Sequence, residues 1–416
     1  MATARAEADF DQNSLEWLAR RHAHNAELRA ESPVIWNRRH GFWFVTGHEE
    51  VAAVARDSAT FTPRYGDGAD DGIDYIGIMG VPRPRDMPRI GIAEADGEQH
   101  AALRRLLNPF MLPPAVAEAR PFVEQATTWF LDRHIESGRM DMVRDLTNPV
   151  PAVLTMRMLG LPYDRWEHYA EVFHATAAHP RSSPEYQRAV GLMPGIIAEV
   201  VETAEARRRQ PESDVLSRLV TAEIEGRRLT NDEVVSVMWN LIGGGLDTST
   251  SLTSLALHHL DSRTDLRQRL IDDPHLIIRA GEEYLRWTSV NETLTRTCTR
   301  DVVLGGQLIR RGDWVMMSWL GANFDPSVFD RPDEVDIDRA PNPHLAFGVG
   351  AHRCIGMHLA RALFQVMVSE VLRRIPDYRV VGEATRFYEG NPELFGVVEM
   401  PVTFSPRPAT GVQAPL

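Results

Sequence analysis

The sequence has few cysteines, no long apolar run and no excess of basic residues. Cys298 and Cys354 are its only cysteines, which are too few for the disulfide framework of a small secreted protein and fit a reducing cytoplasm. The longest stretches without Asp, Glu, Lys or Arg cover residues 234–246 and 248–260, which Asp247 separates. They predict a buried helix and not a membrane span. The net charge of −13 argues against nucleic acid as a partner, since that needs a basic surface. We therefore expect a cytoplasmic protein with neither a nucleic-acid nor a membrane partner.

Helical patterns dominate the chain, and short β-rich segments interrupt them. Between residues 98 and 225 one helical segment follows another, with prolines at the breaks. Residues 63–96 are rich in Gly, Pro and Asp and predict a long functional loop, and residues 175–194 predict a mobile lid. The other expected elements are helices over 15–30, 49–56, 276–288 and 357–375, and strands over 34–36, 42–46, 302–304, 307–309, 314–317 and 397–404.

These patterns predict one fold class and one domain. The expected fold is mainly α with a minor β portion. Because no change of composition marks a boundary, we expect a single domain over residues 11–405. Residues 1–10 and 406–416 are expected to be flexible ends.

A long apolar helix is expected to begin at a capping box, residues 230–233, and to continue to Leu260. Its middle carries the segment Gly243–Thr248, with the sequence GGGLDT. Each helical glycine costs roughly 1 kcal/mol relative to alanine, and a buried Asp is strongly unfavourable without a partner. Two explanations stay open. The helix approaches a planar ligand closely, or it packs closely on a neighbour with Asp247 in a salt bridge.

Cys354 stands at the end of a glycine-broken segment, residues 347–356, with the sequence FGVGAHRCIG. An apolar helix is expected to follow it. A sulfur at the start of a helix is close to the positive end of the helix dipole, which favours thiolate over thiol. A thiolate on a rigid loop suits the ligation of haem iron. The alternative is a buried structural cysteine, the usual state of a lone intracellular Cys.

The segment around Cys354 resembles, position for position, the haem-thiolate loop of the cytochrome P450 family, Phe-Gly-x-Gly-x-His-x-Cys-x-Gly. The GGGLDT segment is similar to the oxygen-activation motif of the family's central helix. The resemblance covers residues 45–404. It implies the cytochrome P450 fold, with haem b (iron protoporphyrin IX) between the central helix and the cysteine-loop helix. It also implies that Cys354 ligates the iron, that Gly244 lies against the haem, and that Asp247 and Thr248 deliver protons.

The resemblance extends to residues that would bind the haem propionates. His100 and Arg104 match the family's His-x-x-x-Arg pair, one helical turn apart. Arg296 matches the arginine at the head of the strand after the Glu-x-x-Arg motif, and His352 matches the histidine two residues before the cysteine. A lone Arg or His is most often an ordinary surface residue, but four matching positions favour a shared anionic ligand.

Three further residues match structural positions of the family. Glu283 and Arg286 form the Glu-x-x-Arg motif, and Arg339 matches its third partner in the segment before the cysteine loop. The resemblance implies that they hold this loop in place and have no catalytic role. Position 324 departs from the family pattern because Phe324 replaces a common Arg. Cys298 is expected to be a small buried side chain and not a second ligand.

The resemblance implies a haem-thiolate monooxygenase that activates O2 with two externally supplied electrons. We expect it to hydroxylate or epoxidise a lipophilic small molecule such as a terpenoid, fatty acid or polyketide. The expected donor is a ferredoxin with an NAD(P)H-dependent ferredoxin reductase, and the expected state is a monomer. Asn240, Asn291 and Glu292 are candidates for orienting a polar group of the substrate. The alternatives are a related enzyme with another outcome (peroxygenase, decarboxylation or oxidative coupling) and a non-catalytic haem-binding protein.

Overall fold

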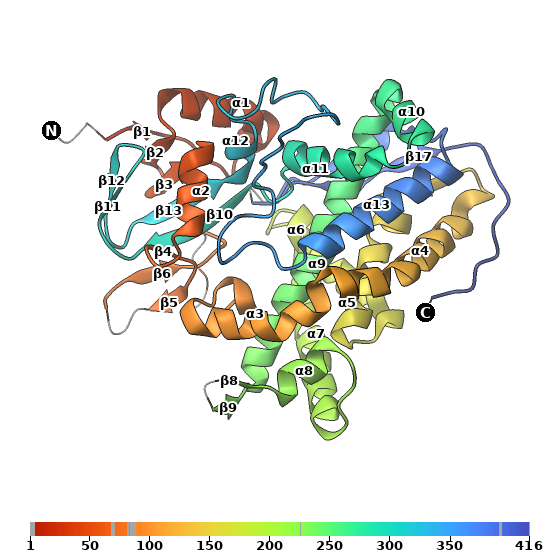
Figure 1. The fold of residues 1–416 in the computed structure, drawn as a ribbon, viewed down its shortest axis with the longest axis horizontal. Helices are drawn as coiled ribbons and strands as arrows, with labels where there is room; N and C mark the ends of the chain where they lie inside the picture. Colours follow the sequence, from red (N-terminus) through yellow and green to blue (C-terminus); the bar gives the residue numbers. More distant parts are fainter. Residues whose placement is uncertain are drawn as a thin grey trace. The chain divides into compact units, whose positions relative to one another are not determined.

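The computed structural model describes residues 5–67, 71–80, 83, 89–224, 226–390 and 393–415. The chain forms two compact units (Figure 1). The first contains Met1–Leu103, Leu285–Cys354 and Pro392–Leu394, and the second contains Arg104–Tyr284, Ile355–Asn391 and Phe395–Leu416. The expected mainly α composition with a minor β portion is confirmed. The expected limits of a single domain, at residues 11 and 405, stay a prediction. No helix within the described ranges is long and apolar enough to cross a bilayer.

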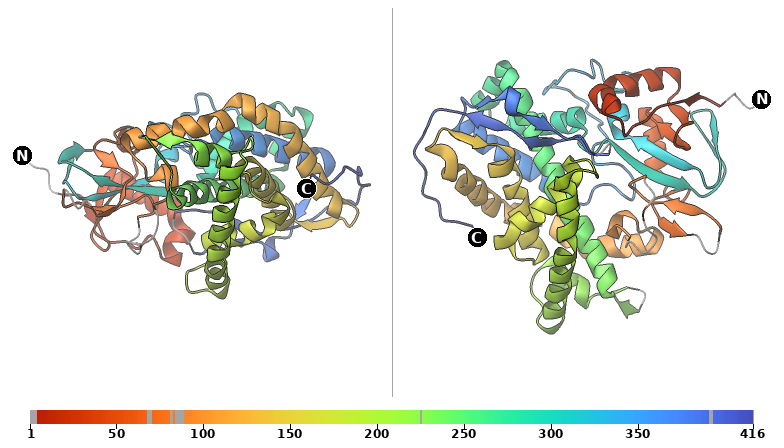
Figure 2. Two further views of the ribbon diagram at one scale, coloured as in Figure 1. Left: turned by 90° about the horizontal axis from the view of Figure 1, so that it is seen from below. Right: turned by 180° about the vertical axis from the view of Figure 1, so that it is seen from behind.

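The first unit is built on a mixed six-stranded sheet. Its strands follow in the order β1 (Glu7–Ala8), β2 (Val34–Asn37), β3 (Phe42–Val45), β13 (Trp314–Ser318), β10 (Thr293–Cys298) and β4 (Phe61–Thr62). β2 and β3 correspond to the predicted strands over 34–36 and 42–46 and form an antiparallel hairpin, with Trp36 opposite Trp43. β13 is parallel to β3 and antiparallel to β10. The right-hand view of Figure 2 shows the red and cyan strands of this sheet side by side.

Successive side chains of β3 lie on opposite faces of this sheet. Phe42 and Phe44 pack with Trp17 of α1 (Leu15–Glu31). Trp43 and Val45 join a second buried cluster with α2 (His48–Arg56). Each face is therefore covered by a helix of the same unit. Ser14 caps α1 as the sequence predicts, since its side chain accepts a hydrogen bond from the backbone N–H of Trp17.

The second unit is mainly helical. Its helices are α4 (Pro113–Ile135), α5 (Pro149–Leu159), α6 (Trp166–Ala178), α7 (Pro184–Arg209), α8 (Val215–Thr221), α9 (Asn231–Ser262), α10 (Thr264–Asp272) and α13 (Met357–Arg374). α3 (Gly97–Met111) and α11 (Leu276–Thr288) each contain the point where the chain passes between the units. α9 is the predicted long helix and begins with the predicted capping box at Thr230. It packs against α5, α6 and α13.

Smaller strands complete both units. In the first unit they are the hairpins β5 (Tyr65–Asp67) with β6 (Asp74–Ile76) and β11 (Val302–Leu304) with β12 (Gln307–Ile309), beside the short helix α12 (Trp319–Asn323). In the second unit they are β14 (Arg379–Val380), β17 (Pro401–Thr403) and β7 (Arg139–Asp141) in one sheet, and the pairs β15 (Arg386–Phe387) with β16 (Val397–Glu399) and β8 (Glu223–Ile224) with β9 (Arg227–Arg228).

Three segments differ from the expectations. The predicted lid over 175–194 is mostly helical, because Ser183 caps α7 and Pro184 occupies its first position, where proline fits. Only residues 179–183 connect α6 to α7. The predicted irregular loop over 63–96 contains the β5–β6 hairpin, although residues 68–70, 81–82 and 84–88 lie outside the described residues. Within the expected flexible N-terminus, Glu7–Ala8 pair with β2, and residues 1–4 lie outside the described residues.

Candidate functional site

Cys354 ends a tight loop in the first unit. Its backbone N–H donates to the carbonyl oxygen of Phe347 at 2.8 Å. Gly348 and Gly350 have φ of 65° and 84°, a conformation that glycine adopts without strain. A Cβ at Gly350 would also lie 2.7 Å from the carbonyl oxygen of Ala55, at the end of α2. The sequence thus dictates the loop's path, and the side chain of Cys354 remains exposed.

A chain of buried polar contacts fixes the start of this loop. Arg286 is fully buried and donates to the carbonyl oxygen of Asn323 at 3.0 Å. The side chain of Asn323 accepts from the backbone N–H of Leu345 at 2.7 Å and donates to Ser289 Oγ at 2.9 Å. Arg286 therefore acts on the cysteine loop through Asn323, which agrees with a structural role for the Glu-x-x-Arg motif.

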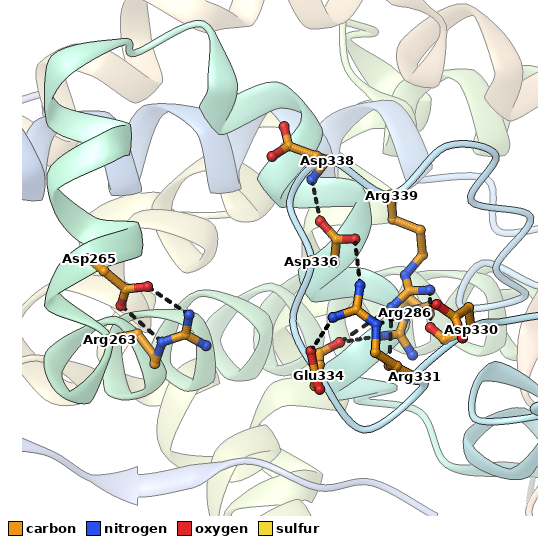
Figure 3. Close-up of polar contacts among 9 residues, drawn as sticks. All are labelled: Arg263, Asp265, Arg286, Asp330, Arg331, Glu334, Asp336, Asp338 and Arg339. Atoms are coloured by element: carbon orange, nitrogen blue, oxygen red, sulfur yellow. Dashed lines mark hydrogen bonds and ion pairs between the residues drawn. The ribbon is translucent and has the colours of Figure 1, made fainter.

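Figure 3 shows that Arg286 and Arg339 also hold the segment between β13 and the cysteine loop. Both donate to the carbonyl oxygen of Glu334, at 2.9 Å and 3.4 Å. The aromatic ring of Phe324, where the family commonly has Arg, lies 5.4 Å from the Arg286 guanidinium carbon. This position supplies a cation–π contact. The pair of Arg263 with Asp265, also drawn in Figure 3, belongs to the second unit and closes the junction of α9 and α10.

Three of the four predicted propionate-binding residues lie in the first unit with two carboxylates. The rings of His100 and His352 are 4.1 Å apart, and His352 Nε2 lies 3.9 Å from Asp96 Oδ1. Burial acts to raise the pKa of Asp96, but hydrogen bonds, from His352 among others, bring it below the usual range. Burial lowers the pKa of Arg296 to about 10, against the opposing charges of Asp96 and Glu94. Arg296 therefore keeps its positive charge at neutral pH.

The guanidinium of Arg296 suits an anionic ligand. Residue Arg296 is 4% exposed, and the carbonyl oxygen of Thr295 at 2.8 Å is the one hydrogen-bond acceptor of its guanidinium in the described part of the chain. Arginine has five N–H donors, so most of them are left for a carboxylate such as a haem propionate. Arg104 follows His100 by one turn of α3. An exposed thiol and a buried, charged arginine in one unit fit haem b as the cofactor.

The three glycines of α9 have different surroundings in the second unit. A Cβ at Gly243 would lie 3.1 Å from the ring of Phe173, and one at Gly245 would lie 2.7 Å from Thr155 Oγ1. A Cβ at Gly244 would meet no atom within 4 Å. Close packing on neighbouring helices therefore explains Gly243 and Gly245. Gly244 is exposed on the helix and is the position where a planar ligand has room.

Asp247 and Thr248 point to different partners. Thr248 Oγ1 donates to the carbonyl oxygen of Gly244 at 2.9 Å. Asp247 is 5% exposed and accepts from Tyr388 at 2.6 Å and 2.7 Å, one contact to each oxygen. His174 Nδ1 lies 2.7 Å from Asp247 Oδ1. The second explanation of the buried Asp247, a salt bridge, thus has a candidate partner in His174 of α6. Sequence reasoning missed His174 and Tyr388, because they are 73 and 141 residues away from Asp247.

Two of the candidate substrate-orienting residues, Asn291 and Glu292, make other contacts in the structure. Glu292 is buried and its carboxylate lies 2.7 Å from Arg21 Nε of α1, so it is not free to orient a substrate. Asn291 bridges to Leu394 through the backbone. In the second unit, the rings of Phe173 and Trp239 are 4.6 Å apart beside Gly243.

Cys298 is buried in the sheet core as expected, and burial raises the pKa of its thiol.

The comparisons with known proteins all identify the same protein family. A sequence profile of the cytochrome P450 family matches residues 179–375. Nocardicin C N-oxygenase of Nocardia uniformis subsp. tsuyamanensis is 33% identical over 396 residues, which are 92% of this chain and 95% of that protein. Steroid C26-monooxygenase of Mycolicibacterium smegmatis is 31% identical over 385 residues, 91% of each chain. The structure is similar to that of a Mycobacterium marinum cytochrome P450 in complex with pseudoionone, with a TM-score of 0.86, 28% identity, and 97% and 100% of the two chains covered.

The two relatives cover nearly the whole chain at more than 30% identity, and the residues of the cysteine loop fit the cofactor that this resemblance implies. This chain belongs to the cytochrome P450 family and is a haem-thiolate monooxygenase with haem b as its cofactor.

Proposed function

We propose that this enzyme hydroxylates or epoxidises a lipophilic small molecule, of the size of a terpenoid, fatty acid or polyketide. The observation that carries the proposal is the open position at Gly244. The preceding residue, Gly243, packs on the ring of Phe173, which pairs with the ring of Trp239. Sites of this kind bind mainly by burying apolar surface and use few polar groups for orientation. A relative named for a steroid and a structural neighbour in complex with pseudoionone support an isoprenoid-like substrate.

In this proposal Cys354 supplies the thiolate, and His100, Arg104, Arg296 and His352 bind the propionates. The bound haem supplies the oxidation chemistry, and the protein supplies binding, orientation and protons. Asp247 and Thr248 would move protons on α9. Thr248→Val is close in volume but lacks the hydroxyl, so electron consumption should continue while product per electron falls. Unchanged product per electron would refute the role of Thr248.

We propose further that a ferredoxin, reduced by an NAD(P)H-dependent reductase, supplies the two electrons, and that the enzyme acts as a cytoplasmic monomer. NAD(P)H consumption through a ferredoxin system, stimulated by substrate, tests the donor. Gel filtration of the holoenzyme tests the oligomeric state.

A spectral binding screen on the ferric holoenzyme tests the substrate class. Steroids, terpenoids, fatty acids and macrolides should shift the Soret band, whereas sugars and nucleotides should not. The strongest ligands are then tested for NAD(P)H-dependent product by mass spectrometry, where a gain of one oxygen atom is expected. Preferential binding of highly polar compounds would refute the proposed substrate class.

A further inference from the structure

The buried carboxylate of Asp247 joins three segments of the second unit. Asp247 lies on α9, His174 lies on α6, and Tyr388 follows β15. α6 and α9 lie side by side in Figures 1 and 2. The backbone N–H of Glu389 donates to the carbonyl oxygen of Ala178 at 3.1 Å, which holds the segment after Tyr388 against the end of α6. The three polar side chains therefore meet in a fixed framework.

The hydrogen atoms in this cluster can be counted. Burial raises the pKa of Tyr388 well above its ordinary value, and the adjacent Asp247 carboxylate adds to this shift, so the phenol is neutral. Its single proton serves the two contacts to Asp247 at 2.6 Å and 2.7 Å, so toward His174 Nδ1, 3.2 Å away, the hydroxyl oxygen can only accept. The 2.7 Å contact between His174 Nδ1 and Asp247 Oδ1 needs a second proton, which lies either on the nitrogen or on the oxygen. Asp247 and His174 therefore share one proton.

The other nitrogen of His174 has a different environment. Nε2 is buried and has no hydrogen-bond partner among the described residues, although the side chain as a whole is 15% exposed. His174 lies in the last turns of α6, just before the connection 179–183. A buried nitrogen that makes no hydrogen bond is costly. It is also the one atom of the cluster at which a proton can be gained without breaking a bond to Asp247.

We propose that His174 is the residue through which Asp247 exchanges protons, and that Tyr388 is a positioning residue that fixes the carboxylate. This inference rests on the proposed role of Asp247 and goes beyond it by naming the source of the proton.

The transfer balances as a relay through the imidazole. A proton from water adds to Nε2 while the Nδ1–H bond breaks and its proton forms the Oδ1–H bond of Asp247. Asp247 then passes a proton toward the side of α9 that carries Thr248. The imidazole is left neutral with its hydrogen on Nε2, and the starting state returns when Nε2 gives that proton to water and Nδ1 takes one from water, so that the ring keeps one N–H. Histidine suits this exchange because its two nitrogens accept and donate near neutral pH.

Other titratable groups surround the imidazole. The Glu171–Arg188 ion pair links α6 to α7 at 3.1 Å. His179, in the connection after α6, interacts electrostatically with His174 and with Glu389, and burial is the largest cause that lowers its pKa. The direct partners of His174 Nδ1 are nevertheless Asp247 Oδ1 at 2.7 Å and the Tyr388 hydroxyl at 3.2 Å.

The test compares His174→Asn with the control His168→Asn, both in the holoenzyme. An asparagine at position 174 keeps an N–H near the place of Nδ1 but cannot pass a proton across the side chain. We expect kcat for product formation to fall by about 10-fold or more, with a larger solvent isotope effect and an unchanged spectral Kd for substrate. His168 lies on the same helix outside the cluster, so its variant should behave as wild type.

A second readout does not depend on turnover. Nitrogen-15 NMR of the ferrous carbon monoxide complex reports which imidazole nitrogen carries hydrogen. The inference predicts that Nδ1 of His174 is protonated in the wild type and that Asp247→Asn changes this pattern. Wild-type kinetics in His174→Asn would overturn the relay. A loss of kcat in this variant that is accompanied by a lower Tm and weaker substrate binding would overturn it as well, because it would reflect a structural defect. Nitrogen-15 signals of His174 that are the same in the wild type and in Asp247→Asn would also overturn the relay. If the wild type oxidises no tested substrate, the proposed function fails, and the NMR comparison still decides the inference.

Discussion

Replacing Tyr388 with phenylalanine tests how much the Asp247 cluster contributes to folding. Tyr388 is 3% exposed, and the substitution keeps the ring while it removes the hydroxyl that donates to both oxygens of Asp247. Hydrogen bonds to a charged group contribute about 1.5–3 kcal/mol each. Since His174 remains as a partner of the carboxylate, we expect the free energy of unfolding to fall by about 2 kcal/mol.

Tyr378→Phe is a matched control in the same unit. Tyr378 is fully buried, and its hydroxyl donates to the neutral carbonyl oxygen of Leu257 at 2.7 Å. A neutral hydrogen bond contributes about 1 kcal/mol, so this variant should lose about half as much stability as Tyr388→Phe. Urea unfolding of both ferric holoenzymes at pH 7, followed by tryptophan fluorescence, gives the comparison. If Tyr388→Phe loses no more than the control, the bonds to Asp247 do not stabilise the fold as argued.

The glycines of α9 and one buried acid give further predictions. Gly244→Ala should stabilise the protein by about 1 kcal/mol through helix propensity, whereas Gly245→Ala should destabilise it by up to about 2 kcal/mol, because its methyl group would collide with Thr155. Equal thermal shifts in the two variants would contradict this packing argument. Burial raises the pKa of Glu292 from 4.5 to about 7, against the opposing ion pair with Arg21. The folded carboxyl therefore holds its proton more tightly than the unfolded one, and the stability this gives is full below pH 4.5 and lost as the pH rises to 7. Glu292→Gln should remove that part of the pH dependence of unfolding, and an unchanged profile would show that the carboxyl stays ionised.

Local chemistry made much of the fold predictable. The N-cap of α1 at Ser14 and the capping box of α9 at Thr230 are satisfied by neighbours within three residues, so the sequence alone determines them. Short β-rich segments at residues 34–36 and 42–46 predicted the strands β2 and β3. The predicted lid was wrong because proline was taken as a helix breaker at Pro184, where it begins α7.

The site was predictable where residues are close in sequence and unpredictable where distant segments meet. Gly348, Gly350 and Cys354 lie on one loop, so the spacing alone placed them together. The ion pair of Glu292 with Arg21 and the contacts of Asp247 with Tyr388 depend on tertiary packing, which no local pattern encodes. For the same reason, both explanations of the α9 glycines stayed open until their neighbours were known.

The assignment of Cys354 as the proximal ligand is the central claim, and the carbon monoxide spectrum of the reduced protein tests it most directly. Cys354→Ser should abolish the red-shifted Soret band, because a neutral hydroxyl donates far less charge to the iron than a thiolate. Cys298→Ser is the control and should keep the band, since Cys298 is buried in the sheet core with its thiol donating to the carbonyl oxygen of Arg300 at 2.9 Å. A red-shifted band that persists in Cys354→Ser, or disappears in Cys298→Ser, would contradict the assignment.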